Sequence, residues 1–317
     1  MPHFGRIVTS TEEKITKEGA KKSRQVNKGD LILSNSMSYG LPYIMGIDGY
    51  IHDGWFVLKN FENTFDKDYL CNLLISRAIQ NQYKRLAAGG VVQNISSDLV
   101  NSVSVSIPTM MEQKKISSLL NLIDERIATQ NKNIDKLKSL IKGIAQKIVH
   151  SNKPNVRLSE CLECKSSTLQ ESEVCEQGTY PVYGANGIVG YLDNYNTESE
   201  AVYIIKDGSG VGTVSYVTGK CSATGTLNTL QAKEGYSLHY LYYLLKVFNF
   251  EPYKTGMAIP HIYFKDYGKA KVFCPSYTEQ LQYARLLSAI DNKLSIEQNI
   301  LTELSLQKQC LLRQMFI

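Results

Sequence analysis

The chain has 317 residues, of which 43% are hydrophobic, and a formal net charge of +5 at pH 7. This length is enough for two domains with ordinary cores, and the charge is too small to argue for nucleic-acid binding by itself. Its seven cysteines form no disulfide framework, and no apolar run is long enough for a signal core or a membrane span. We therefore expect a reduced, soluble, cytoplasmic protein with no membrane association.

The predicted elements occur in the same order in each half of the chain. A short apolar strand runs into a Ser/Gly turn at 31–40 and again at 203–212. An aromatic and apolar helix follows at 69–79 and at 238–248. Each half then continues with a Gly-containing loop, a strand, a proline and a long helix.

An internal repeat accounts for this shared order. With an offset of 167, Pro108 falls on Pro275, and the pair Glu112-Gln113 falls on Glu279-Gln280. The match needs no gap over nearly sixty residues, and upstream it continues with an offset of 172. On that second offset residue 1 corresponds to residue 173, whereas the second copy begins near Val156. We therefore expect the first copy to be shortened at its N-terminal end.

Two long helices carry an apolar stripe with heptad spacing. After Pro108 the apolar positions are four and three residues apart alternately, which is typical of a coiled-coil seam. The same seam recurs 167 residues later, and the polar position Gln130 recurs as Glu297. The predicted seam consists of Ile116, Leu120, Ile123, Ile127, Ile134, Leu137 and Ile141, and of Leu287, Ile290, Leu294, Leu301, Leu304 and Leu311.

The two stripes have two explanations. Each helix could pack on its own domain, or the two helices could pack on each other. We favour mutual packing, because a small domain cannot bury so narrow a stripe along nearly forty residues. The chain returns across the second copy between the helices, which predicts an antiparallel pair. Such a helix would be about 57 Å long, somewhat over one and a half turns of DNA, and would act as a spacer.

Catalytic and metal-binding motifs are not evident. Cys161 and Cys164, with Cys175 beyond them, have no second CxxC or paired histidines nearby, so we expect no metal site. The glycine-rich stretch at 207–214 lacks the phosphate-loop lysine and enters no helix, which favours a turn between strands. We therefore expect a chain that is not an enzyme and has no catalytic residues.

The tyrosine-rich second half is a better candidate for binding nucleic acid. Fifteen of the twenty tyrosines lie between Tyr180 and Tyr283, among Asn, Ser, Thr and isolated lysines. Such groups hydrogen-bond base edges or phosphates, although β-strand propensity also explains most of these tyrosines. Loops on a rigid scaffold are the usual place for such contacts. The candidates for DNA contact are Tyr183, Asn186, Lys206, Ser209, Lys254 and His261, together with Ser36 and Ser38 in the first copy.

With these motifs the chain resembles the specificity subunit of a type I restriction-modification system. The resemblance is carried by YPVYGANGIVGY at 180–191, IIKDGSGVGTV at 204–214, LHYLYYLLK at 238–246 and TGMAIPHI at 255–262. It is also carried by the duplicated Pro-x-x-x-Glu-Gln helix openings and by ITKEGAKKSRQVNKGDLILSNS at 15–36. The sequence departs from the family at Ile259, where the family commonly has an amide residue before the proline.

The resemblance implies an α+β fold with two related target-recognition domains, built from mixed or antiparallel sheets with short helices, joined by two long antiparallel coiled-coil helices. We expect a shortened first domain at 1–110, a helix at 111–150, a second domain at 151–275 and a helix at 276–317. The implied partners are double-stranded DNA read as a bipartite site, methyltransferase subunits and a restriction subunit. No cofactor is expected on this chain, because the partner methyltransferase binds S-adenosylmethionine. Two alternatives remain: a silent or recombination-cassette copy of such a subunit, and a coiled-coil protein adaptor.

Overall fold

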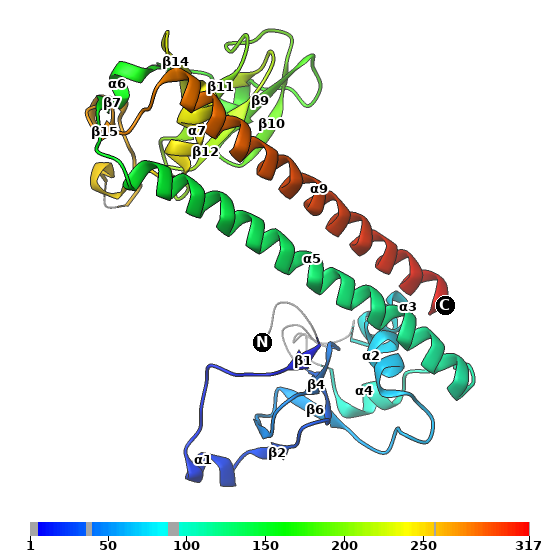
Figure 1. The fold of residues 1–317 in the computed structure, drawn as a ribbon. Helices are drawn as coiled ribbons and strands as arrows, with labels where there is room; N and C mark the ends of the chain where they lie inside the picture. The colour runs from blue at the N-terminus through cyan, green and yellow to red at the C-terminus, as the bar shows by residue number, and fades with distance from the viewer. Residues whose placement is uncertain (1–5, 36–39, 88–94, 257, 317) are drawn as a thin grey trace. The chain divides into compact units, whose positions relative to one another are not determined.

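The computed structural model describes residues 6–35, 40–87, 95–256 and 258–316. These residues divide into two compact units, which are described separately (Figure 1). The first unit contains residues 1–134 and 296–317, and the second contains residues 135–295. Both units thus combine one copy of the repeat with part of each long helix.

The first module, from β1 to α4, is built on a four-stranded sheet in the order β1-β4-β3-β6. A two-stranded ribbon of β2 and β5 covers one face of this sheet. The strands are β1 (Ile7–Val8), β2 (Arg24–Val26), β3 (Leu31–Ser34), β4 (Pro42–Met45), β5 (Gly49–Ile51) and β6 (Trp55–Leu58). The helices are α1 (Lys17–Lys21), α2 (Lys67–Ile75), α3 (Arg77–Ala87) and α4 (Ser97–Asn101).

The second module, from β7 to β15, has a four-stranded sheet in the order β12-β11-β14-β8, a second sheet in the order β10-β9-β13, and the pair β15-β7. Its strands are β7 (Val156–Arg157), β8 (Leu162–Ser166), β9 (Tyr180–Gly184), β10 (Gly187–Leu192), β11 (Ala201–Ile205), β12 (Val214–Val217), β13 (Ser222–Ala223), β14 (Leu227–Ala232) and β15 (Lys271–Val272). Its helices are α6 (Leu158–Cys161), η1 (Glu171–Glu173), α7 (Leu238–Val247), η2 (Glu251–Tyr253) and α8 (Phe264–Tyr267).

The structure shifts one part of the repeat alignment by a residue. Ile32 packs in the cluster between the first module's sheet and its ribbon, and Tyr203 packs in the matching cluster of the second module. Ser34 and Ile205 also have matching backbone hydrogen bonds, because Gly40 N donates to Ser34 O as Gly212 N donates to Ile205 O. β3 and β11 are therefore related by 171 residues and not by the 172 of the sequence alignment. Side chains alternate between the faces of a strand, so a shift of one residue would have put every β3 side chain on the wrong face.

The long helices are α5 (Met110–His150) and α9 (Tyr277–Met315), and both begin with the same capping arrangement. The side chain of Glu112 accepts a hydrogen bond from the backbone N–H of Thr109, and Glu279 does the same for Ser276. In α5 the backbone N–H of Glu112 also donates to Thr109 Oγ1, which completes a capping box, and in α9 the Ser276 hydroxyl donates to the Glu279 carboxylate. The duplicated Pro-x-x-x-Glu-Gln motif supplies these residues.

The glutamine of each motif anchors its helix to the module before it. Gln113 Oε1 accepts from the backbone N–H of Asp66, the residue that caps α2, at 2.9 Å. Gln280 Oε1 accepts from Ser237, which caps α7, at 2.9 Å. Both glutamines are almost fully buried. One local motif therefore both starts the long helix and attaches it to the preceding shorter one.

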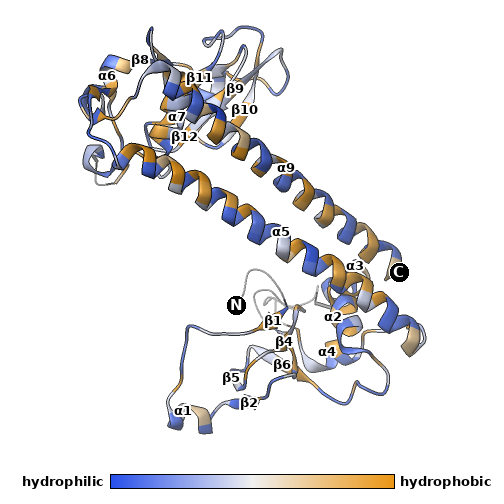
Figure 2. Ribbon diagram, in the orientation of Figure 1, coloured by the Kyte–Doolittle hydropathy of each residue, from blue (hydrophilic) through white to orange (hydrophobic). Residues whose placement is uncertain are grey.

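The predicted seam coincides with the least exposed face of each long helix. All of its positions are buried or half-buried, while most of their neighbours in the chain are exposed. Figure 2 shows the apolar residues recurring along α5 and α9. In the first unit Gln130 Nε2 donates to the backbone carbonyl of Glu297 at 2.9 Å and also to its carboxylate.

The direction of the two helices follows from a second contact in the same unit. Lys308 forms an ion pair with Asp124, so residue numbers rise along α5 as they fall along α9. This confirms the antiparallel pair. Leu120 of α5 and Phe316, just after α9, also belong to one buried cluster with α2 and α3. Mutual packing of the helices and packing on the module therefore occur together, and the two explanations of the stripe do not exclude each other.

Candidate nucleic-acid interface

Two loops that are distant in sequence meet at the end of β11. The turn at 206–213 follows β11, and the segment at 254–263 follows η2. Gly208 N donates to Pro260 O at 2.9 Å, and Ile262 N donates to Lys206 O at 3.0 Å. We call residues 206–213, 254–256 and 258–263 the loop cluster. Backbone hydrogen bonds hold it together, so its side chains extend from a defined framework.

Gly256 fixes the bend in the second of these loops. Its φ of +88° lies in the left-handed region, which residues with a side chain rarely adopt. A Cβ on this residue would lie 2.3 Å from the carbonyl oxygen of Ile259. The bend therefore needs glycine for its conformation and also for the close approach of the backbone.

Four of the predicted contact residues lie in the loop cluster. Ser209 is exposed at its tip, and Lys206 is half-buried at its base. Lys254 forms an ion pair with Glu251 at 2.6 Å. The backbone of His261 exchanges two hydrogen bonds with Thr255. The structure thus brings together residues from segments some fifty positions apart in the sequence.

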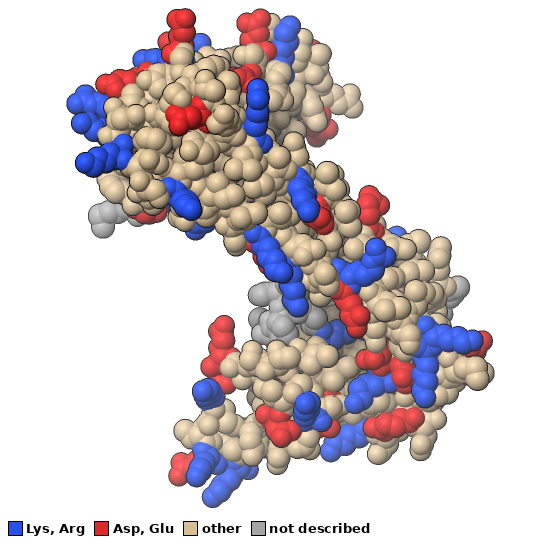
Figure 3. Space-filling model, in the orientation of Figure 1, with Lys and Arg blue, Asp and Glu red and all other residues tan. Residues whose placement is uncertain are grey.

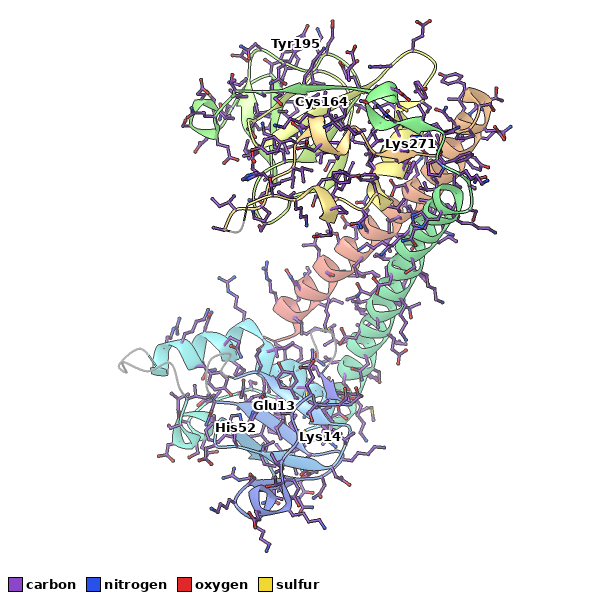
Figure 4. All side chains as sticks on the ribbon, turned by 90° about the vertical axis from the view of Figure 1, so that its left-hand side faces the viewer. Glu13, Lys14, His52, Cys164, Tyr195 and Lys271 are labelled. Atoms are coloured by element: carbon purple, nitrogen blue, oxygen red, sulfur yellow. The ribbon has the colours of Figure 1, made fainter. Side chains whose placement is uncertain are left out.

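The charge of Lys206 lies close to the interior of the sheet. Burial raises the pKa of the Cys164 thiol to about 11, and the nearby positive charge of Lys206 partly opposes this shift. Figure 4 shows Cys164 among the strands of the second module. Lys206 therefore supplies positive charge at the base of the loop cluster and not at its tip.

Tyr263 at the end of the loop cluster is paired with Lys265 in α8, and the sequence analysis did not identify this pair. Tyr263 is 47% exposed. Lys265 Nζ lies 5.1 Å from the centroid of its ring, and His261 meets the ring edge-on at 5.5 Å. The alternation His-x-Tyr-x-Lys at 261–265 could have indicated side chains on one surface. A lysine over an exposed aromatic ring can contact a phosphate while the ring contacts a sugar or base.

The hairpin of β9 and β10 lies next to the loop cluster. Asn186 is exposed in its turn, as predicted. Tyr183 is half-buried and packs edge-on against Tyr203 at 5.7 Å, so most of its ring serves the module's core. Its carbonyl accepts a hydrogen bond from Thr224 N, two residues before Thr226, whose carbonyl accepts from Lys206 N.

A second exposed tyrosine has a similar lysine partner. Tyr195 is 37% exposed, and Lys220 Nζ lies 4.8 Å from its ring centroid. Tyr180 packs edge-on against the same ring at 5.2 Å. Figure 4 labels Tyr195 at the periphery of the second module. The predicted contacts Ser36 and Ser38 of the first module lie outside the described residues.

The surface has no large area of one charge on the face drawn in Figure 3, where lysine and arginine side chains lie among aspartates and glutamates. Within the part of the chain that the structure describes, no group of three or more His, Cys, Asp or Glu side chains is placed to hold a metal ion. Cys161 lies 3.8 Å from Cys274 and both are buried. Among the helices of the described residues, none combines the length and the apolar character that a membrane-spanning helix requires.

An apolar groove lies between the long helices in the first unit. Its lining includes Leu119, Leu122, Arg126, Ile300 and Gln307. Leu119, Leu122 and Ile300 lie outside the seam and are 41%, 58% and 41% exposed, whereas the seam residues Ile123, Leu304 and Leu311 also line the groove. The seam therefore does not use all the apolar surface of the helix pair in this unit.

Comparison with known proteins identifies the family. The sequence model described as "Type I restriction modification DNA specificity domain" matches twice, at residues 4–139 and 151–306. The chain belongs to this family. The two matches correspond to the two copies of the repeat, each taken with most of the long helix that follows it.

The relatives of this specificity-domain chain are distant. A putative type I specificity subunit of Mycoplasma genitalium is 26% identical over 261 residues, which cover 75% of this chain and 68% of that protein. The EcoprrI specificity subunit of Escherichia coli is 27% identical over 130 residues, which cover 41% of this chain and only 31% of that protein. The crystal structure of a type I S subunit from M. genitalium has a TM-score of 0.64 at 21% identity, over 92% of this chain and 84% of that one. This likeness confirms the predicted fold.

Proposed function

We propose that the chain is the DNA-recognition subunit of a type I restriction-modification complex, and that the second module reads one half of a bipartite site through its loop cluster. The observation that carries the proposal is the loop cluster itself. It presents Ser209, His261 and the Tyr263–Lys265 pair on hydrogen-bonded backbone, in a chain whose family is defined by DNA specificity. Polar side chains on a rigid frame can read base edges, and lysines position the phosphates.

The helix pair has a separate role in the proposal. The first module would read the other half-site, and the helices would set the spacing between the two. The exposed apolar groove of Leu119, Leu122 and Ile300 would dock a methyltransferase subunit. That partner would bind S-adenosylmethionine and carry out the chemistry, and a restriction subunit would join the assembled complex.

The test is methylation by the assembled complex. The chain is co-expressed with a type I methyltransferase subunit from the same organism, and the methylated sites are mapped across the host genome. A bipartite methylated motif is the expected result. A motif with a single half-site, or with two symmetric copies of it, would restrict reading to the second module. Absence of methylation despite an assembled complex would refute the proposal and favour a silent copy.

Variants separate the loop cluster from general effects of charge. Lys265→Ala and Tyr263→Ala should weaken DNA binding by the complex at least about tenfold, which corresponds to 1.4 kcal/mol. Lys233→Ala is the matched control, because Lys233 is exposed at the opposite end of β14 from Lys206. Affinity is measured across a salt series, since a lost phosphate contact lowers the salt dependence. Equal losses in Lys233→Ala and Lys265→Ala would contradict the assignment of the interface.

A further inference from the structure

Two buried cysteines of the second module lie side by side. Cys161 is the last residue of α6, and Cys274 lies two residues after β15. Their sulfur atoms are 3.8 Å apart, and the two residues are 0% and 6% exposed. The Cys161 thiol donates a hydrogen bond to Arg157 O at 3.3 Å, so its lone pairs are left to accept the thiol proton of Cys274. The two thiols are therefore in direct contact.

The backbone around both cysteines is fixed by the rest of the module. β7 and β15 pair antiparallel, and Figure 1 shows α6, β7 and β15 together at one side of the second module. The side chain of Asn155 donates to Cys274 O at 2.7 Å and accepts from Cys274 N at 2.9 Å. The carbonyl of Cys161 accepts from Lys233 N at 2.9 Å. A bond between the two sulfur atoms would therefore need only rotation of side chains on a backbone that is already held.

Cys161 differs in its ionisation from the other buried cysteines. Burial raises the pKa of Cys71 to about 12, and burial also raises the pKa of Cys221. The pKa of Cys161 is instead lowered, because the hydrogen bond from Cys274 outweighs burial and the Tyr236 hydroxyl adds a smaller contribution. The thiolate is the form of cysteine that reacts with oxidants. Cys161 is therefore the more reactive member of the pair.

Tyr236 connects the pair to solvent. It is half-buried and lines a groove of about 790 Å³ between α9 and the second module, together with Glu163, His239 and Arg285. Its hydroxyl hydrogen-bonds the Cys161 thiol, so a single side chain reaches from the groove to the buried sulfur. Motion of this side chain gives an oxidant close to the size of water a short route to Cys161.

We propose that Cys161 and Cys274 form a redox-active dithiol, which a small hydroperoxide such as hydrogen peroxide oxidises to an intramolecular disulfide. In the first step the Cys161 thiolate attacks a peroxide oxygen and the O–O bond breaks. Cys161 becomes a sulfenic acid, and the departing hydroxide takes up the Cys161 proton. In the second step the Cys274 sulfur attacks the Cys161 sulfur, the S–O bond breaks, and water leaves with the Cys274 proton. The two thiols thus lose two electrons and two protons, and the peroxide is reduced to water.

Peptide mapping of the oxidised full chain tests the proposal. The exposed Cys175 and Cys310 are replaced by serine throughout, so that they cannot form disulfides between molecules. The reduced chain is treated with hydrogen peroxide without denaturant, free thiols are alkylated, and the unreduced digest is analysed by mass spectrometry. We expect one cross-linked peptide pair, joining Cys161 to Cys274, that dithiothreitol separates. A folded chain in which Cys161 stays a free thiol or becomes a sulfinic acid, with no cross-link, would overturn the proposal.

Two serine variants distinguish the roles of the cysteines. Cys274→Ser should leave Cys161 as a sulfenic acid that dimedone traps, because the second thiol is gone. The matched control is Cys164→Ser, a half-buried position three residues from Cys161, which should form the cross-link as fast as the parent chain. Loss of the cross-link in folded Cys164→Ser, or a new cross-link from Cys161 to another cysteine in Cys274→Ser, would contradict a preformed pair.

Urea unfolding provides a measurement that does not depend on replacing a buried cysteine. The bond would join residues 113 positions apart, so the cross-linked chain should unfold at a higher urea midpoint than the reduced chain. Circular dichroism follows the transition. A lower midpoint would mean that the bond distorts the module, which is the opposite of what two thiols already in contact should give.

Discussion

The seam can be tested with neighbouring leucines that differ only in burial. Leu120 and its repeat counterpart Leu287 are 0% and 1% exposed, whereas the adjacent Leu119 and Leu286 are 41% and 50% exposed. Substitution of a fully buried leucine by alanine costs about 2.7–5 kcal/mol, because transfer free energy is lost and a cavity remains. Substitution of an exposed leucine in a helix should cost less than about 0.5 kcal/mol, since little burial is lost and alanine favours the helix.

Urea unfolding measures the difference. With a slope of about 2 kcal/mol/M, Leu120→Ala should lower the midpoint by roughly 1.3 to 2.5 M, and Leu119→Ala should change it by less than about 0.3 M. Trp55 emission reports the first unit, which contains Leu120, and far-ultraviolet circular dichroism reports both units. Two probes are needed, because a chain with two compact units need not unfold in a single transition.

The pair Leu286→Ala and Leu287→Ala repeats the comparison in the second unit. We expect Leu287→Ala to shift the circular dichroism transition strongly and Leu286→Ala to leave it nearly unchanged. Equal destabilisation by Leu119→Ala and Leu120→Ala would refute the reasoning, because it would mean that the heptad stripe is not the buried face of α5.

Three further predictions concern the loop, the polar seam positions and alkaline pH. Gly256→Ala should weaken DNA binding more than Gly235→Ala, as measured by titration with labelled DNA. Both glycines have a positive φ, but only at Gly256 would the added Cβ lie 2.3 Å from a carbonyl oxygen, so equal effects of the two variants would contradict this prediction. Gln130→Leu should destabilise the first unit by about 1–3 kcal/mol, since Glu297 then loses the side-chain amide that donates a hydrogen bond to it. The double variant Gln130→Leu with Glu297→Leu should recover that loss, as measured by a double-mutant cycle of urea midpoints. Burial raises the pKa of Tyr83 from 10.0 to about 12. The stability that the neutral Tyr83 hydroxyl contributes is therefore complete below pH 10 and is lost as the pH rises towards 12, because the unfolded chain ionises first. Urea midpoints that do not fall over this pH range would contradict the prediction.

The sequence determined the features whose cause is local in the chain. Heptad spacing located the seam, because the period of a helix puts every third or fourth residue on one face. The duplicated Pro-x-x-x-Glu-Gln motif located the start of each long helix, because a capping box needs only residues three positions apart. The repeat predicted a second module with the same order of elements, and Asn186 was correctly placed in an exposed turn.

The tertiary structure decided what depends on distant pairings. The register of β3 differs by one residue from the alignment, since strand pairing and the packing of Ile32 set it. The contact of the two loops in the loop cluster depends on hydrogen bonds between Lys206 and Ile262, which no local pattern encodes. Neighbours in sequence limit conformation over a few residues, whereas sheet edges and loop clusters arise when the whole chain packs.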